Sequence, residues 1–164
     1  MKTKILFFLT FLMFFSSFGE INAQQLWSEL NKQDNSILES EILQKKNFPS
    51  TYKLFALDIT ALKSELALQS RNSETIIELP NSKGGLSKFK IKETSNFDEK
   101  LASKFPMIKS YSAQGIEDPT AVAKISIGVD GFHAIVFSGK EKTMYIDPYS
   151  KNNQNYILYK RNDV

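Results

Sequence analysis

Two alternating apolar runs joined by a short turn constrain this sequence more than any other feature. The first run covers residues 131–137, and the second covers residues 143–146 and ends at Asp147 and Pro148. Two extended runs separated by a short glycine-containing turn predict a β-hairpin. Because both alternating sets of positions in the first run carry apolar residues, we expect the hairpin to lie in the middle of a sheet rather than at its edge.

Most of the remaining chain also has strand-like character. Further strands are expected at residues 52–59, 75–79, 86–92, 108–112, 121–129 and 156–160. Short helices are expected at residues 61–68, capped by Asp58 or Thr60, and at residues 97–105, capped by Asn96 or Asp98. The predicted fold class is therefore α+β, with a mainly antiparallel sheet of about seven or eight strands and two or three short helices.

The segment from residue 24 to residue 48 is expected to form a helical arm in front of the main domain, which covers residues 49–164. Leu26, Trp27 and Leu30 recur at spacings that indicate helical turns. Two roles are open for this arm. In the first, the arm packs Trp27, the only tryptophan of the chain, against the body of the domain. In the second, the arm is a helix that binds in a groove of a partner protein. We favour the packing role.

The first 23 residues have the pattern of a secretory signal peptide. Lys2 and Lys4 form a positive start, an apolar run follows at residues 5–15, and Ala23 precedes the expected cleavage before Gln24. The apolar run is shorter than the roughly 20 residues that a membrane-spanning helix needs. We therefore expect a secreted chain, periplasmic or extracellular, with no membrane association after the signal is removed.

Composition limits the kinds of site that this chain can form. The chain has no cysteine, so a thiol nucleophile and a cysteine-based zinc site are both excluded. Its net charge of +3 is small for a nucleic-acid-binding protein, and we expect no nucleic-acid partner. An apolar fraction of 41% is sufficient for a packed core.

The candidate binding residues lie in the predicted hairpin. His133 is the only histidine, so the HExxH motif of zinc proteases is absent, and we expect no metal or cofactor in this chain. Asp147 and Tyr149 flank Pro148 in a turn that could bind a partner, although turn formation alone explains them. We interpret Phe132, His133, Asp147 and Tyr149 as candidate partner-binding residues and predict no catalytic residue. A hydrolase that uses Asp147 and His133 is the weakest alternative, because no third partner is evident.

A succession of short segments carries a resemblance to a known family. The segments are Leu26-Trp27, Tyr52-Lys53-Leu54-Phe55-Ala56-Leu57-Asp58 followed by Leu62 and Leu66, Ile77-Glu78-Leu79-Pro80 with Phe89, Glu99-Lys100-Leu101-Ala102, Lys104-Phe105-Pro106-Met107-Ile108-Lys109-Ser110-Tyr111, Gly115-Ile116-Glu117-Asp118-Pro119-Thr120-Ala121, Gly131-Phe132-His133-Ala134 and Tyr145-Ile146-Asp147-Pro148-Tyr149. In this order the chain resembles the N-terminal propeptide region of secreted, reprolysin-like (M12B-type) zinc metallopeptidases of the Bacteroidetes kind.

This resemblance implies a propeptide that assists the folding of its protease and keeps it latent until cleavage. The implied partner is the cognate metallopeptidase catalytic domain, in cis or in trans. Zinc would belong to that catalytic domain, which is absent from this chain. Without a cysteine to bind the zinc, latency would be steric or would use a residue beyond Val164. The alternative is a stand-alone secreted binding module for protein or carbohydrate.

Overall fold

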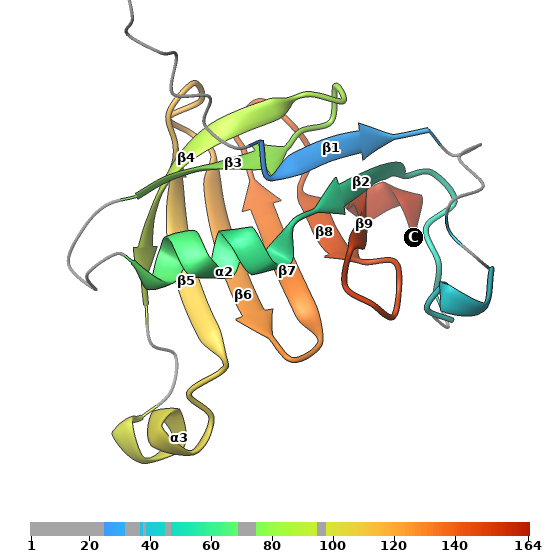
Figure 1. Cartoon of the computed structure of the whole chain (residues 1–164). Helices are drawn as coiled ribbons and strands as arrows, with labels where there is room; N and C mark the ends of the chain where they lie inside the picture. The colour runs from blue at the N-terminus through green and yellow to red at the C-terminus, as the bar shows by residue number, and fades with distance from the viewer. Residues whose placement is uncertain (1–24, 32–36, 38, 45–46, 69–74, 95–97) are drawn as a thin grey trace, which may run out of the picture.

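The computed structural model describes residues 25–31, 37, 39–44, 47–68, 75–94 and 98–164. Within them lies one nine-stranded antiparallel sheet with the order β1-β2-β9-β8-β7-β6-β5-β4-β3 (Figure 1). The strands are β1 (Trp27–Leu30), β2 (Lys53–Leu57), β3 (Thr75–Pro80), β4 (Leu86–Glu93), β5 (Lys109–Gly115), β6 (Val122–Gly128), β7 (Gly131–Phe137), β8 (Met144–Pro148) and β9 (Asn155–Lys160). The expected signal peptide, with its cleavage between Ala23 and Gln24, lies outside the described residues.

The sheet curls into a half-barrel whose two edge strands approach each other. Strands β3 to β9 form a meander, and β2 and β1 continue the sheet beyond β9. Edge strand β1 comes into contact with the opposite edge strand, β3 (Figure 1). At this seam Glu29 of β1 forms an ion pair with Lys53 at 2.8 Å, and both side chains lie beside Gly84 of the β3–β4 turn.

The structure corrects the predicted fold class from α+β to mainly β. The described residues contain only two α-helices, α2 (Ile59–Ala67) and α3 (Glu99–Lys104), and neither forms a layer of its own. Helix α2 covers the concave side of the sheet and buries Leu62, whereas α3 lies in the connection between β4 and β5. Asp58 caps the N-terminus of α2 and Asp98 caps the N-terminus of α3. Each carboxylate accepts a hydrogen bond of 2.8 Å from a backbone N–H in the first turn of its helix.

The predicted helical arm is wrong for residues 27–30, which form strand β1, one strand more than the seven or eight expected. Residues Trp27–Leu30 form β1, and a 3-10 turn, η2, covers Glu39–Glu41. Trp27 is buried while Ser28 and Glu29 are exposed, and all three lie in register with β2. The favoured packing of Trp27 on the domain is confirmed, but the tryptophan enters the central core rather than a peripheral contact.

Three aromatic side chains from distant parts of the chain form the centre of the core. Trp27, Phe132 and Tyr156 are each at most 1% exposed, and their rings meet edge to face with centroids 5.3–6.1 Å apart. The Tyr156 hydroxyl donates to the carbonyl of Asn153 at 3.0 Å, which satisfies its polar end, and burial raises the pKa of Tyr156 to about 12. The core therefore joins β1, β7 and β9.

The predicted hairpin is confirmed, and so is its central place in the sheet. Strands β7 and β8 pair directly and have four strands on one side and three on the other. On the inner face of β7 the side chains of Phe132, Ala134 and Val136 are buried. On the outer face Ile135 and Phe137 are exposed, so among the described residues no second layer covers the apolar residues of this alternating set.

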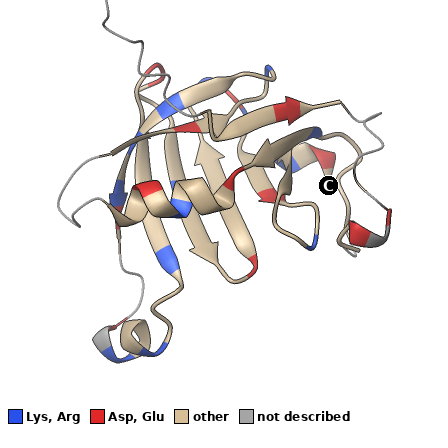
Figure 2. Ribbon diagram, in the orientation of Figure 1, with Lys and Arg blue, Asp and Glu red and all other residues tan. Residues whose placement is uncertain are grey.

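Charged residues are spread over the described elements. Figure 2 shows basic and acidic residues interspersed along the sheet and its turns. None of the helices among the described residues is both long enough and apolar enough to span a bilayer.

Candidate functional site

The four candidate partner-binding residues fall in three different environments. Phe132 is fully buried in the core, where its ring packs on Trp27, so it presents no surface to a partner. His133 and Asp147 lie together on the outer face of β7 and β8. Tyr149, just after β8, belongs to a separate aromatic group.

The register of the hairpin brings His133 and Asp147 together. Ala134 pairs with Ile146, and one step further along the two strands His133 stands opposite Asp147. The His133 Nδ1 atom is 2.8 Å from Asp147 Oδ1, and its Nε2 atom is 3.2 Å from Oδ2 of Asp130 in the β6–β7 turn. The imidazole ring therefore faces a carboxylate at each nitrogen.

Two tyrosines extend this polar cluster across the outer face. The Tyr159 hydroxyl donates to Asp147 Oδ2 at 2.6 Å. Burial, and then the hydrogen bond and charge of Asp147, raise the pKa of Tyr159 above its ordinary value. Tyr159 also stacks on its cross-strand partner Tyr145, with ring centroids 5.3 Å apart and planes 17° from parallel. We call Asp130, His133, Asp147 and Tyr159 the outer polar cluster.

The outer polar cluster places one imidazole ring between two carboxylates. Within the described part of the chain no group of three or more histidine, cysteine, aspartate or glutamate side chains is arranged to hold a metal ion. A serine, Ser126, stands in register with His133 on β6, a neighbour that sequence reasoning missed. General-base catalysis would require His133 Nε2 to take a proton, and Asp130 lies on that side of the ring.

An exposed apolar patch adjoins this cluster. Val122 on β6 and Phe137 on β7 are register partners, and Ile135 lies on the same face of β7. Ile135 is in turn the cross-strand partner of Tyr145, so the patch is next to the tyrosine pair. We call Val122, Ile135 and Phe137 the outer apolar patch.

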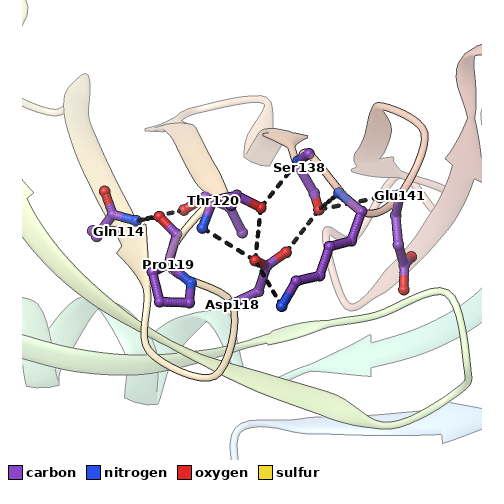
Figure 3. A network of polar contacts seen from close by, with 9 residues as sticks. Gln114, Asp118, Pro119, Thr120, Ser138 and Glu141 are labelled. Carbon is purple, nitrogen blue, oxygen red and sulfur yellow. Dashed lines mark hydrogen bonds and ion pairs between the residues drawn. The ribbon is translucent and has the colours of Figure 1, made fainter.

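A second polar network lies at one end of the half-barrel, in the loops on either side of β6 and β7. In Figure 3 the Asp118 carboxylate is at its centre: Oδ1 accepts from the Thr120 hydroxyl at 2.7 Å and its backbone N–H at 3.1 Å, and Oδ2 accepts from the Ser138 hydroxyl at 2.7 Å. Lys140 Nζ lies 3.4 Å from Oδ1. The hydrogen bonds from Thr120 and then Ser138 lower the pKa of Asp118 to about 2.

The Asp118 network fixes two loops that are distant in sequence. Thr120 Oγ1 accepts from the backbone N–H of Gly139 at 3.1 Å, and Ser138 Oγ accepts from the backbone N–H groups of Lys140 and Glu141. The β5–β6 and β7–β8 loops are thereby joined through side chains and backbone alike. Nothing in a single sequence shows that Ser138 lies beside Asp118, so this network is not predictable from the sequence alone.

Comparison with known proteins does not assign this chain to a family. No family model, no curated protein and no solved structure matches it.

Proposed function

We propose that this chain is the propeptide-like domain of a secreted zinc metallopeptidase, which binds the peptidase catalytic domain, keeps it latent and assists its folding. The ordered segments that resemble such propeptides support this class of partner. The structural observation that supports protein binding is the outer apolar patch. It exposes 39% of Val122, 37% of Ile135 and 48% of Phe137 on the outer face of two central strands.

The surroundings of the patch suit a protein interface. Singly exposed apolar side chains are normal, but these three are neighbours on one face. The Tyr145–Tyr159 pair lies beside them, and the outer polar cluster follows along β7 and β8. Interfaces typically have an apolar centre enriched in aromatic residues and a polar rim. Steric latency would need an interface of roughly 800 Å² on each partner.

Inhibition in trans tests this proposal. The purified chain is expected to inhibit the separately produced catalytic domain of the peptidase encoded with it, in an assay with a peptide substrate. Ile135→Asp places a charge in the centre of the outer apolar patch and is expected to weaken inhibition about tenfold or more. The matched control is Leu68→Asp, which changes a side chain that is 88% exposed and lies just after α2.

Two outcomes of the inhibition assay would contradict the proposal. One is a folded wild-type chain that neither binds nor inhibits the catalytic domain. The other is inhibition that Ile135→Asp and Leu68→Asp leave equally intact. The proposal also requires that a zinc-peptidase motif, HExxHxxGxxH, is encoded either after codon 164 or in a neighbouring gene. Absence of the motif from both places would count against the proposal.

A separate aromatic group favours a second candidate, a stand-alone module that binds carbohydrate or another protein. Phe48, Tyr52 and Tyr149 lie with ring centroids 5.2–6.0 Å apart, and Phe48 is 39% exposed. Such rings could stack on a sugar. Binding to a glycan panel that Tyr149→Ala abolishes without loss of the fold would support this function over the first.

A further inference from the structure

The bonds around Asp147 decide which ring nitrogen of His133 gains and loses a proton. Asp147 Oδ2 accepts from the Tyr159 hydroxyl at 2.6 Å, and Asp147 Oδ1 lies 2.8 Å from His133 Nδ1. An ionised carboxylate can only accept hydrogen bonds, so the Nδ1 atom must donate and carries a proton in both the neutral and the charged ring. The titrating atom of His133 is therefore Nε2.

The Nε2 atom faces a second carboxylate, which comes from the β6–β7 turn. Asp130 Oδ2 lies 3.2 Å from Nε2, and Nε2 itself is shielded from solvent. Without a proton, Nε2 presents its lone pair to this carboxylate, and the contact is repulsive. With a proton, the same contact is an ion pair. Because the Asp130 side chain is 71% exposed, it can turn away from the ring into water when the attraction is lost.

The other described neighbours of the ring bring no competing positive charge. On the β6 side the ring meets Ser126, which is uncharged, and the ammonium group of Lys124, the next outward residue of that strand, donates to a serine of β5 at 2.7 Å. Tyr159 reaches the ring only through Asp147, and burial raises its pKa above the ordinary value, so its phenol stays neutral. The charged groups that the described residues bring against His133 are thus two carboxylates, and both favour the imidazolium form.

We infer that the outer polar cluster is a pH-sensitive clamp, in which a proton on His133 Nε2 ties the β6–β7 turn to β7 and β8, and loss of this proton above neutral pH releases Asp130. The ring is 36% exposed, so the two carboxylates outweigh the cost of its partial burial. The clamp therefore stabilises the fold fully below about pH 6.5, and its contribution is lost as the pH rises through the higher midpoint of the folded chain. Release also makes the outer face more acidic beside Ile135 of the outer apolar patch. This inference does not depend on the proposed peptidase partner.

Proton NMR of the folded chain measures the protonation of His133 directly, because this is the only histidine and gives one set of ring signals. The midpoint of its titration is expected about one pH unit above the ordinary value of about 6.5. Asp130→Asn removes the charge that faces Nε2 and is expected to lower the midpoint by about half a unit or more. The matched control is Glu65→Gln, which removes a carboxylate from an exposed position of α2 and is expected to leave the midpoint unchanged.

A double-mutant cycle tests whether this proton also acts as a clamp. Asp130→Asn, His133→Gln and the double variant are compared with the wild type by urea unfolding at about pH 5.5 and about pH 9. The pair is expected to change the unfolding equilibrium constant about twofold to fivefold at the lower pH, and to have no coupling at the higher pH. If His133→Gln does not fold, the NMR titrations of the wild type and Asp130→Asn decide alone. A midpoint at or below about 6.5, a midpoint that Asp130→Asn leaves unchanged, or a coupling of equal size at both pH values would overturn the inference.

Discussion

Truncation of Trp27 tests whether β1 is part of the fold or an appendage. The side chain is 1% exposed and meets the rings of Phe132 and Tyr156 edge to face at 5.3 and 5.4 Å. A buried aromatic residue removes about 150–250 Å² from water, which at about 25 cal/mol per Å² corresponds to about 4–6 kcal/mol. Measured truncations of buried Phe or Trp cost about 3–5 kcal/mol. Trp27→Ala is therefore expected to remove a large part of a stability that is typically about 5–15 kcal/mol.

Urea unfolding followed by far-UV circular dichroism measures this loss, since the variant lacks the only tryptophan and its fluorescence. With a urea dependence of about 1–3 kcal/mol per molar, the midpoint of Trp27→Ala should fall by about 2 M. Trp27→Phe retains an aromatic ring, so its urea midpoint should lie between those of the wild type and Trp27→Ala. Glu29→Gln, in the same strand, breaks only an exposed ion pair and should cost less than about 1 kcal/mol. A loss below about 1 kcal/mol for Trp27→Ala would refute the assignment of β1 to the central core.

Three further predictions concern the seam and the polar networks. Gly84 has a φ of +95°, and a Cβ there would lie 2.5 Å from Glu29 Oε2. Gly84→Ala should therefore lower the free energy of unfolding by about 1–2 kcal/mol. Gly85→Ala should lower it less, because the Cβ at that position would meet no atom closer than 3.5 Å. The lowered pKa of Asp118 means that its carboxylate stabilises the fold above about pH 4 and that this contribution is lost as the pH falls towards 2. Asp118→Asn should therefore be less stable than the wild type at pH 6 and approach it near pH 2 in urea titrations; a constant difference would contradict the assignment. The raised pKa of Tyr159 means that the folded state favours the neutral phenol, so the wild type should lose stability as the pH rises above 10. Tyr159→Phe should reduce this alkaline loss of stability. An alkaline stability profile that Tyr159→Phe leaves unchanged would contradict the prediction.

The sequence predicts most of the sheet because period-two alternation is a local property. Strands β2 to β9 were all expected near their observed positions, since each presents alternating or β-branched residues between turn residues. The predicted fold class was wrong because it treated two short helices as a separate structural layer. In the structure, α2 buries Leu62 against a sheet that already forms most of the core.

The first strand was missed because its local pattern indicates a helix. Leu26, Trp27 and Leu30 are spaced as on a helical face, and β1 is a four-residue edge strand with one register partner, β2. Long-range pairing, which a window of neighbouring residues does not contain, decides its conformation.

The candidate site was predictable only in part, and the reason is again the range of the contacts. The meeting of His133 and Asp147 follows from the register of one hairpin, so a sequence argument could place them opposite each other. Phe132, in the same hairpin, was assigned to a binding surface although the alternation that exposes His133 turns Phe132 inward. The bond between Asp118 and Ser138 joins two loops across two strands and leaves no signal in the sequence.

The pairing of β2 with β9 has a consequence for the order in which the molecule can assemble. Lys53 of β2 lies opposite Leu158 of β9, so β1 and β2 cannot pair with the rest of the sheet until residue 158 has been synthesised. Such non-local closure slows folding, because the loop entropy must be lost before the contacts form. A nascent chain of this design stays incompletely folded while it emerges from the ribosome, and a ribosome-bound chain arrested before codon 155 should remain sensitive to proteases.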